Sequence, residues 1–473
     1  MKTLEQAYQE FDYEQLIETQ LFGNPQSINA YEECCGRYVG LNKVALIWQG
    51  KNAESAQWTF EQLAEASAKL ANYFQQIGLK QGDCIAGLLP RTPELLITIF
   101  ATWRIGAIYQ PLFTAFESKA IEHRVETAQT QLIVTNEEQR PKLNGIQLAN
   151  ILTVYQQDTT HKQDPDFWTE ANQQSSEQSP VMLTFEDDFL MMFTSGTTGL
   201  AKSVPVPLKA VLAFKEYMRH AVDLREDDSF WNLADPGWAY GLYYGITGPL
   251  GLGHSIIMDE RAFSVDNALE IIGQYKVSNL TGSPTAFRMF FGFKEKFDET
   301  IKSHLRAVSS AGEPLTPEVI HWFKGYGGNN RKSFVGNYYL TGDTVRFNEL
   351  GGVDFIGRAD DVITTSGYRV GPFDVESTLL ECVEVLESAV IGKPDPERTE
   401  IVKAFVVLKP QYTGSDELNL KLQDYVRSRL SKHSYPREIA FVESLPKTSS
   451  GKIQRNLLKQ QEIAKMQGIQ QVS

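Results

Sequence analysis

The sequence predicts an α/β fold, with a large N-terminal region of mixed sheets followed by a small α+β C-terminal domain. Helical segments alternate with short apolar strands along most of the chain. The 473 residues are enough for more than one domain of ordinary size. The final part, about 110 residues, changes to a helix, strand, strand, helix pattern that is typical of a separate small unit.

The alternation begins with an amphipathic segment at 59–79, which predicts a helix. "DCIAGLLP" (83–90) predicts a buried strand, 93–106 a second helix, and "QLIVTN" (131–136) another strand. Strands that alternate with helices favour a largely parallel sheet.

The middle of the chain contains a polar stretch, 156–187, rich in Gln, Asp, Ser and Thr, which we interpret as a surface loop. "FLMMF" (189–193) predicts a strand and 208–220 a helix. Strands and helices then continue to alternate as far as "LRAVSSAGEPLTPEVIHWF".

The C-terminal unit is indicated by three segments. "DVESTLLECVEVLESAVIGKPDP" predicts a helix and then a strand, "IVKAFVVLKP" a strand, and "LKLQDYVRSRLSKH" a helix. We place the boundary near Arg358–Asp360, which gives domains at 1–359 and 360–473.

Composition excludes several classes of protein. The net charge of −14 argues against a nucleic-acid or anionic-membrane binder, although a few cations in a cleft still suffice for an anionic substrate. The four cysteines have no zinc spacing, so we expect reduced thiols. The polar start is not typical of a signal peptide, and no apolar run is long enough for a membrane span. These features predict a cytoplasmic protein.

"FTSGTTGLAKSVPVP" (193–207) is the segment richest in phosphate-binding chemistry. A Walker loop, G-x-x-x-x-G-K-[ST], is one interpretation, but Ala201 replaces its second glycine. Pro205 and Pro207 also prevent a helix from beginning there. The alternatives are a flexible Ser/Thr/Gly loop that binds phosphate through hydroxyl and N–H groups, with Lys202 adding charge, or a plain surface loop.

Five stretches in order resemble the motifs of the adenylate-forming (AMP-binding) superfamily, in its acyl-CoA synthetase branch. "TSGTTGLAKS" resembles the phosphate loop, "SAGEP" (310–314) the adenine turn and "YYLTGD" (338–343) the ribose motif. "GRADDVITTSGYRVGPFDVE" (357–376) resembles the hinge, and "PKTSSGKIQR" (446–455) the catalytic lysine loop. They span most of the chain.

The resemblance implies a ligase of fatty acid metabolism that uses ATP, Mg²⁺ and coenzyme A. Such enzymes convert a carboxylic acid and MgATP into acyl-AMP and pyrophosphate. A small mobile C-terminal domain then turns, and a thiol, usually coenzyme A, accepts the acyl group.

The resemblance also implies which residues bind the nucleotide. Asp343 accepts hydrogen bonds and suits the ribose hydroxyls, and the forked Arg358 suits ribose or phosphate. Arg369 could meet the nucleotide phosphates. The residues matched to the phosphate loop and the adenine turn are Thr194, Ser195, Gly196, Thr197, Thr198, Gly199, Lys202, Gly312, Glu313 and Pro314.

Lys452 is implied as the catalytic residue, whose charge would stabilise the transition state of adenylation. Asp360 matches the hinge. Ser366, Gly367 and Tyr368 would line the coenzyme A tunnel, where glycine permits close approach of the thiol. Taken alone, Asp343 is also consistent with a turn cap, Arg358 with an interface salt bridge, Asp360 with a loop acid, and Lys452 with a surface charge.

"LADPGWAYGLYYGITGPLGLGHS" (233–255) resembles the acyl-pocket segment of synthetases for short- and medium-chain acids. Trp238 would form a pocket wall that limits chain length; a core tryptophan is the alternative. The chain ends soon after the lysine loop, which favours free coenzyme A over a carrier domain as acceptor.

One part of the family pattern is missing. Gly312 and Gly342 are only 30 positions apart (342 − 312), where family members carry several tens of residues more. The aromatic-Gly-x-Thr-Glu motif, whose Glu holds Mg²⁺, and the following β-subdomain are absent, so the domain is shortened between about 325 and 338. No other acid is identified as a metal ligand.

Loss of a metal-binding carboxylate should lower the rate by orders of magnitude. Three hypotheses therefore stand. The first is an acyl-CoA synthetase. The second is a non-catalytic nucleotide or acyl-CoA binding protein of the same fold. The third is an aryl or fatty acid adenylating enzyme with a protein thiol acceptor. The particular acid and the oligomeric state are not predicted.

Overall fold

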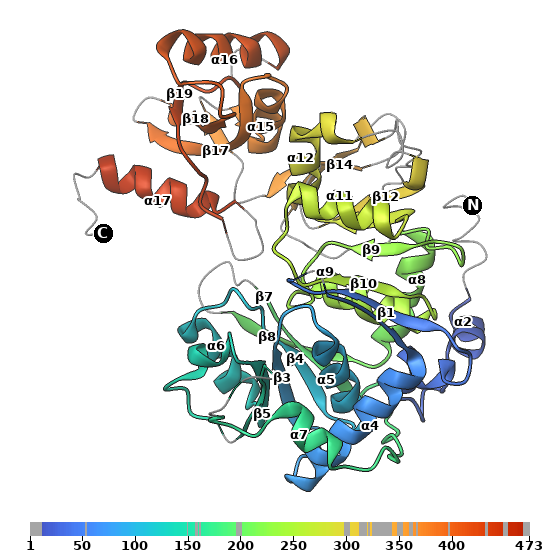
Figure 1. Cartoon of the computed structure of the whole chain (residues 1–473). Helices are drawn as coiled ribbons and strands as arrows, with labels where there is room; N and C mark the ends of the chain where they lie inside the picture. The colour runs from blue at the N-terminus through green and yellow to red at the C-terminus, as the bar shows by residue number, and fades with distance from the viewer. Residues whose placement is uncertain are drawn as a thin grey trace. The chain divides into compact units, whose positions relative to one another are not determined.

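The structure is a computed structural model and groups the chain into two compact units (Figure 1). The first contains most residues up to Ser283 together with Glu295–Ser310, and the second contains Pro284–Lys294 and most residues of the C-terminal part. The boundary at 359/360 stays a prediction. The residues described are 12–52, 54–148, 150–156, 159, 162–194, 201–297, 303–311, 319, 322–323, 343–347, 353–358, 363–365, 368–395, 398–430, 434–447 and 453–466.

The largest sheet of the first unit has the order β6-β5-β3-β4-β7-β8 and is parallel except for its last pair. This confirms the predicted parallel sheet. Its strands are β3 (Cys84–Leu88), β4 (Ile108–Pro111), β5 (Leu132–Asn136), β6 (Asn150–Val154), β7 (Asp188–Thr194) and β8 (Lys202–Pro207).

The helices that connect these strands have clear sequence causes. α4 (Phe60–Gln76) begins with a capping box in which Thr59 and Gln62 exchange hydrogen bonds. α5 (Pro93–Arg104) carries proline at its first position and is buried along most of its length. Both helices were predicted. α6 (Ser118–Ala128) follows β4.

The prediction of a loop over 156–187 is wrong at one place, because α7 (Phe167–Asn172) lies within it. Asp166 caps α7 through the N–H of Thr169, and Phe167 is fully buried. Trp168 stacks on Trp58 with ring centroids 6.4 Å apart. Burial of Phe167 and partial burial of Trp168 stabilise a helix that the polar composition of the stretch conceals.

Two three-stranded sheets complete the first unit, in the orders β10-β1-β2 and β12-β11-β9, and the second is parallel. Their strands are β1 (Val44–Gln49), β2 (Ser55–Thr59), β9 (Phe230–Asn232), β10 (Ile256–Asp259), β11 (Asn279–Gly282) and β12 (Ala307–Ser310). The remaining helices are α2 (Tyr13–Gln20), α3 (Ala30–Cys34), α8 (Ala210–His220), α9 (Ala239–Leu242), the π-helix η3 (Tyr243–Thr247), α10 (Gly248–Gly251) and α11 (Val265–Gln274). Short 3₁₀ helices lie at Gly36–Tyr38, Arg140–Leu143 and Lys294–Lys296.

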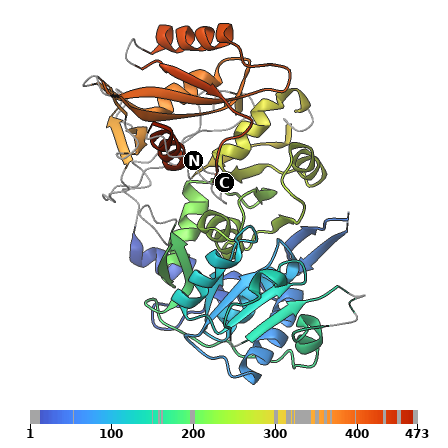
Figure 2. The ribbon, with the colours of Figure 1, turned by 90° about the vertical axis from the view of Figure 1, so that its left-hand side faces the viewer.

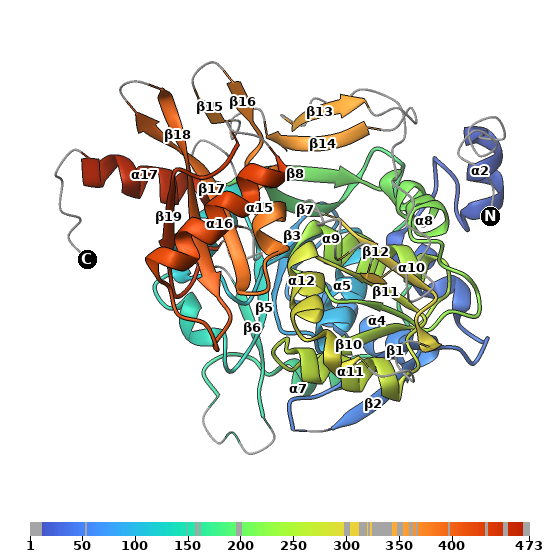
Figure 3. The ribbon, with the colours of Figure 1, turned by 90° about the horizontal axis from the view of Figure 1, so that it is seen from above.

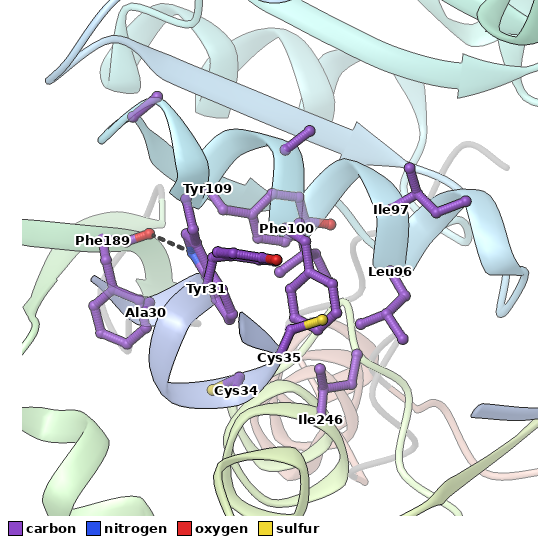
Figure 4. Close-up of a cluster of buried hydrophobic side chains, with 14 of the residues drawn as sticks. Ala30, Tyr31, Cys34, Cys35, Leu96, Ile97, Phe100, Tyr109, Phe189 and Ile246 are labelled. Atoms are coloured by element: carbon purple, nitrogen blue, oxygen red, sulfur yellow. Dashed lines mark hydrogen bonds between the residues drawn. The ribbon is translucent and has the colours of Figure 1, made fainter. Parts of the chain in front are cut away.

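The main core includes a cluster of buried side chains between α3 and α5 (Figure 4). Tyr31 lies edge-on to Phe100 and directly over the guanidinium of Arg104, at 3.7 Å. Cys34 and Cys35 are buried next to these residues, and their thiols are free. Burial raises the pKa of Cys34 to about 12. The other two cysteines are also free and buried.

The second unit contains a five-stranded sheet with helices on both faces (Figure 2). Val390 and Val406 face α15 (Pro372–Leu380) and α16 (Asp416–Arg429), whereas Ile391 and Val407 face α17 (Arg455–Met466). This alternation is the period-2 burial of a strand covered on both sides. The strands are β15 (Ile363–Thr365), β16 (Tyr368–Val370), β17 (Val385–Asp395), β18 (Thr399–Leu408) and β19 (Glu438–Phe441).

The second unit also contains the ribbon β13 (Asp343–Phe347) and β14 (Val353–Arg358), seen from above in Figure 3. Helix α12 (Pro284–Gly292) of the second unit packs Phe287 against Phe323, with ring centroids 5.2 Å apart. The predicted helix and strands of the C-terminal part are confirmed as α15, β17, β18 and α16.

Candidate active site

The glycine-rich segment connects β7 to β8, which pair antiparallel. Their register places Thr194 opposite Lys202, and the Lys202 side chain is exposed. Ser195, Gly196, Thr197, Thr198 and Gly199 lie outside the described residues. β8 forms the edge of the sheet, where its two prolines cost no ladder hydrogen bond. A strand follows the segment, so the prediction that no helix begins there is confirmed.

α6 contacts both strands at the base of this segment. The Nε2 atom of His123 lies 2.8 Å from the carbonyl oxygen of Ala201. The guanidinium of Arg124 lies 4.1 Å from the ring centre of Phe116 and 5.6 Å from that of Phe193. Burial lowers the pKa of Arg124. Sequence reasoning missed both α6 residues, because nothing local marks contacts so distant along the chain.

Trp238 lies in the segment after β9 and contacts aromatic residues that follow β4. Its ring centroid is 5.5 Å from that of Phe113 and 5.4 Å from that of Phe116. A Cβ on Gly237 would lie 2.7 Å from the Cα of Phe113, so only glycine permits this approach. The buried Nε1 of Trp238 has no hydrogen-bond partner among the described residues. Loops from two parallel sheets therefore meet at an aromatic wall.

Polar residues surround the same strand ends. Arg91, after β3, lies 3.5 Å from Asp235, whose carboxylate accepts the N–H of Gly237 at 2.8 Å. The hydroxyls of Thr281 and Ser309 lie 2.7 Å apart at the ends of β11 and β12. Carboxyl ends of parallel strands are the usual place for a ligand in open α/β sheets. Sequence reasoning also missed these residues, although their positions just after or at the ends of strands were a usable signal.

Tyr240 lies among these polar and aromatic residues. Its backbone carbonyl accepts a hydrogen bond from Asn232 at 3.3 Å, and its ring lies edge-on to Tyr244, with centroids 5.6 Å apart. Burial raises the pKa of Tyr240 well above its ordinary value. The hydroxyl therefore stays protonated and uncharged at neutral pH.

In the second unit, the predicted ribose residue and the predicted arginine are partners in one ribbon. Asp343 begins β13 opposite Arg358 at the end of β14. In the next hairpin Tyr368 lies opposite Thr365, and Arg369 opposite Thr364. The remaining predicted residues, Gly312, Glu313, Pro314, Asp360, Ser366, Gly367 and Lys452, lie outside the described residues.

The described residues show no metal cluster and no membrane span. No group of three or more His, Cys, Asp or Glu side chains is placed there to hold a metal ion. Within the same part of the chain, no helix is both long and apolar enough to cross a membrane.

Two family models match the chain. The model of the AMP-binding enzyme matches residues 32–355, and that of the AMP-binding enzyme C-terminal domain matches 374–452. The loops of the parallel sheets and most of the β13–β14 ribbon lie within the first match, and most of the five-stranded sheet lies within the second.

Known synthetases are similar over nearly their whole length. Acetyl-coenzyme A synthetase of Bacillus subtilis is 31% identical, with 98% of this chain and 96% of that protein covered. The human mitochondrial acyl-coenzyme A synthetase ACSM4 is 31% identical, with 88% and 86% covered. A crystal structure of a Brucella canis acyl-CoA synthetase is 43% identical, with a TM-score of 0.74 and 98% and 100% covered.

Fold, site and relatives define an AMP-forming acid–thiol ligase. The chain belongs to the AMP-binding enzyme family, in its acyl-CoA synthetase branch. Enzymes of this class use ATP to convert a carboxylic acid into acyl-AMP and then transfer the acyl group to coenzyme A.

Proposed function

We propose that this ligase activates a short- or medium-chain carboxylic acid in the cytoplasm, as a step of fatty acid metabolism. The observation that carries the choice of acid is the aromatic wall of Trp238, Phe113 and Phe116. Three large rings that meet at the predicted acyl segment would limit the length of a bound chain. The acetyl-coenzyme A synthetase of Bacillus subtilis, named for a two-carbon acid, supports the same choice.

Nucleotide binding is proposed for the residues predicted from the motifs. The β7–β8 hairpin would present its connecting segment and Lys202 to the phosphates, and the paired ends of β13 and β14 would present Asp343 and Arg358 to the ribose. An aspartate and an arginine together supply an acceptor and donors, which suits a ribose with its adjoining phosphate.

Mg²⁺ is the proposed metal, bound through phosphate oxygens of ATP, where it would offset the negative charge. The described residues hold no group of three or more His, Cys, Asp or Glu side chains that could bind the metal without the nucleotide. The alignment with the Bacillus subtilis protein spans 550 positions, more than the 473 residues of this chain, which supports the proposal that this chain lacks residues present in that protein.

The acid is tested by incubating the purified chain with ATP, Mg²⁺, coenzyme A and straight acids from acetate to octanoate. We expect one or two neighbouring acids to give acyl-CoA and AMP in equal amounts. Acyl-CoA formation only from longer or aromatic acids would contradict the proposed acid. Transfer to a protein thiol and not to coenzyme A would favour the third hypothesis.

Lys452 is tested by separating the half-reactions. Lys452→Ala should abolish acyl-AMP formation, because it removes the charge that stabilises the transition state. It should leave the transfer of supplied acyl-AMP to coenzyme A within about threefold of wild type, because that step uses a different domain orientation. Equal loss of both half-reactions would refute the role.

A further inference from the structure

The two ends of the segment that contains Lys452 are held together. Lys447 and Ile453 form an antiparallel bridge. The N–H of Gln454 donates to the carbonyl of Pro446 at 2.9 Å, and its side-chain amide donates to the carbonyl of Lys447 at 3.3 Å. The base of the segment is therefore closed by backbone pairing on both sides of Lys452.

An ion pair fastens this base to the body of the second unit. The Nε and Nη2 atoms of Arg455, the first residue of α17, donate to the two carboxylate oxygens of Glu376 at 2.9 and 2.7 Å. Glu376 is 5% exposed and also accepts the N–H of Val390 at 2.7 Å. A two-point pair of this kind fixes orientation as well as distance. The Glu376 carboxylate belongs to α15 and is also bonded to β17. The ion pair therefore fixes Arg455 to the packed elements of the second unit.

Arg455 lies three residues after Lys452, a reach of about 10 Å for extended chain. Because only two residues separate them, a change at Arg455 would be passed on to Lys452. Reacting groups displaced by about 1 Å can lose about a hundredfold in rate. We propose that Glu376 and Arg455 are positioning residues that hold Lys452 for adenylation, a role that rests on the proposed function of Lys452.

The same helix offers a matched control. Glu462 lies seven residues after Arg455 on α17, is 3% exposed, and accepts a hydrogen bond from Lys403 of β18 at 2.7 Å. It joins α17 to the same sheet but lies about two helical turns from the segment base. Glu462→Gln therefore weakens the docking of α17 and leaves the base intact.

The experiment compares Glu376→Gln, Arg455→Lys and Glu462→Gln in the full chain. For the first two we expect kcat of acyl-AMP formation to fall about 10- to 100-fold, the KM for ATP to stay within about twofold, and thioester formation from supplied acyl-AMP to stay within about threefold. Glu462→Gln should leave both half-reactions within about twofold. Equal losses in Glu376→Gln and Glu462→Gln, or parallel loss of both half-reactions, would overturn the role.

A readout without catalysis separates this role from the proposed function. Trypsin cleavage after Lys452, followed by mass spectrometry, should be faster in Glu376→Gln than in wild type, and unchanged in Glu462→Gln. Unchanged cleavage in Glu376→Gln would overturn the positioning role. If the wild type forms no acyl-AMP with any acid, the proposed function fails, whereas the cleavage rates still decide whether Glu376 holds the segment.

Discussion

The Nε2 atom of His123 lies 2.8 Å from the carbonyl oxygen of Ala201, which is 78 residues further along the chain. A carbonyl oxygen only accepts, so Nε2 carries the hydrogen and donates. This bond joins α6 to the strand that leaves the glycine-rich segment, and Arg124 approaches Phe193 in the strand that enters it. α6 therefore supports the base of the proposed phosphate loop from both sides.

We predict that His123→Ala raises the KM for ATP about fivefold with little change in kcat. Loss of one hydrogen bond is worth about 1 kcal/mol, and the looser hairpin would hold the phosphates less well before reaction. The measurement is initial rate against ATP concentration. His220→Ala is the control, because the His220 side chain is 59% exposed and pairs with Glu216 of the same helix, α8. Equal KM values for the two variants would contradict the supporting role of α6.

Arg306→Met should destabilise the first unit by about 3 kcal/mol, because it leaves the buried carboxylate of Asp228 without its cation. Asp228 is 2% exposed, and Arg306 also bonds Asp223 at 2.8 Å. Urea unfolding measures the change. Arg225→Ala is the control, since Arg225 is 50% exposed and pairs with Asp223 at the surface; it should cost less than about 1 kcal/mol. Similar losses would show that burial of Asp228 is not the cause.

Stability should fall in acid partly through Asp228. Burial alone would raise the pKa of Asp228, but hydrogen bonds from Arg306 and Ser278 lower it below the ordinary value. The unfolded chain therefore binds the proton more readily. The stabilisation is present above the unfolded pKa, about 4, and is lost as pH falls through the folded value. Urea midpoints from pH 6 to pH 3 should decline less steeply in Asp228→Asn than in wild type. Parallel declines would contradict this contribution.

Trp238→Ala should extend the range of acids towards longer chains, because it removes one ring of the aromatic wall. We expect the ratio of kcat/KM for octanoate to that for propionate to rise about tenfold or more, since each accommodated methylene is worth about 1 kcal/mol or more. Trp168→Ala is the control, because it removes an indole that stacks on Trp58 away from the aromatic wall. An unchanged ratio in Trp238→Ala would assign Trp238 to the core alone.

Sequence reasoning succeeded where local patterns decide the structure. α4 has helical spacing and a capping box, and β3 is a short apolar run that is buried at every position. Pro205 and Pro207 excluded a helix after the glycine-rich segment, and β8 is an edge strand that tolerates both. In each case propensity and tertiary packing favour the same conformation.

Sequence reasoning failed where packing decides. α7 has only six residues, and it is stabilised by buried Phe167 and partly buried Trp168 in a stretch of polar composition. The contact between His123 and Ala201 depends on the crossing of α6 and β8, which no local pattern encodes. The motifs indicated Asp343 and Arg358 separately, but only the ribbon shows that they share one register position.

The central claim is that this chain forms acyl-AMP. The most direct measurement is ATP–pyrophosphate exchange by the purified chain, with each acid from acetate to octanoate, in the presence and absence of Mg²⁺. We predict exchange with at least one acid that requires Mg²⁺ and disappears in Lys452→Ala. ATP binding by the folded chain without exchange for any acid would contradict the claim and favour a non-catalytic nucleotide-binding protein.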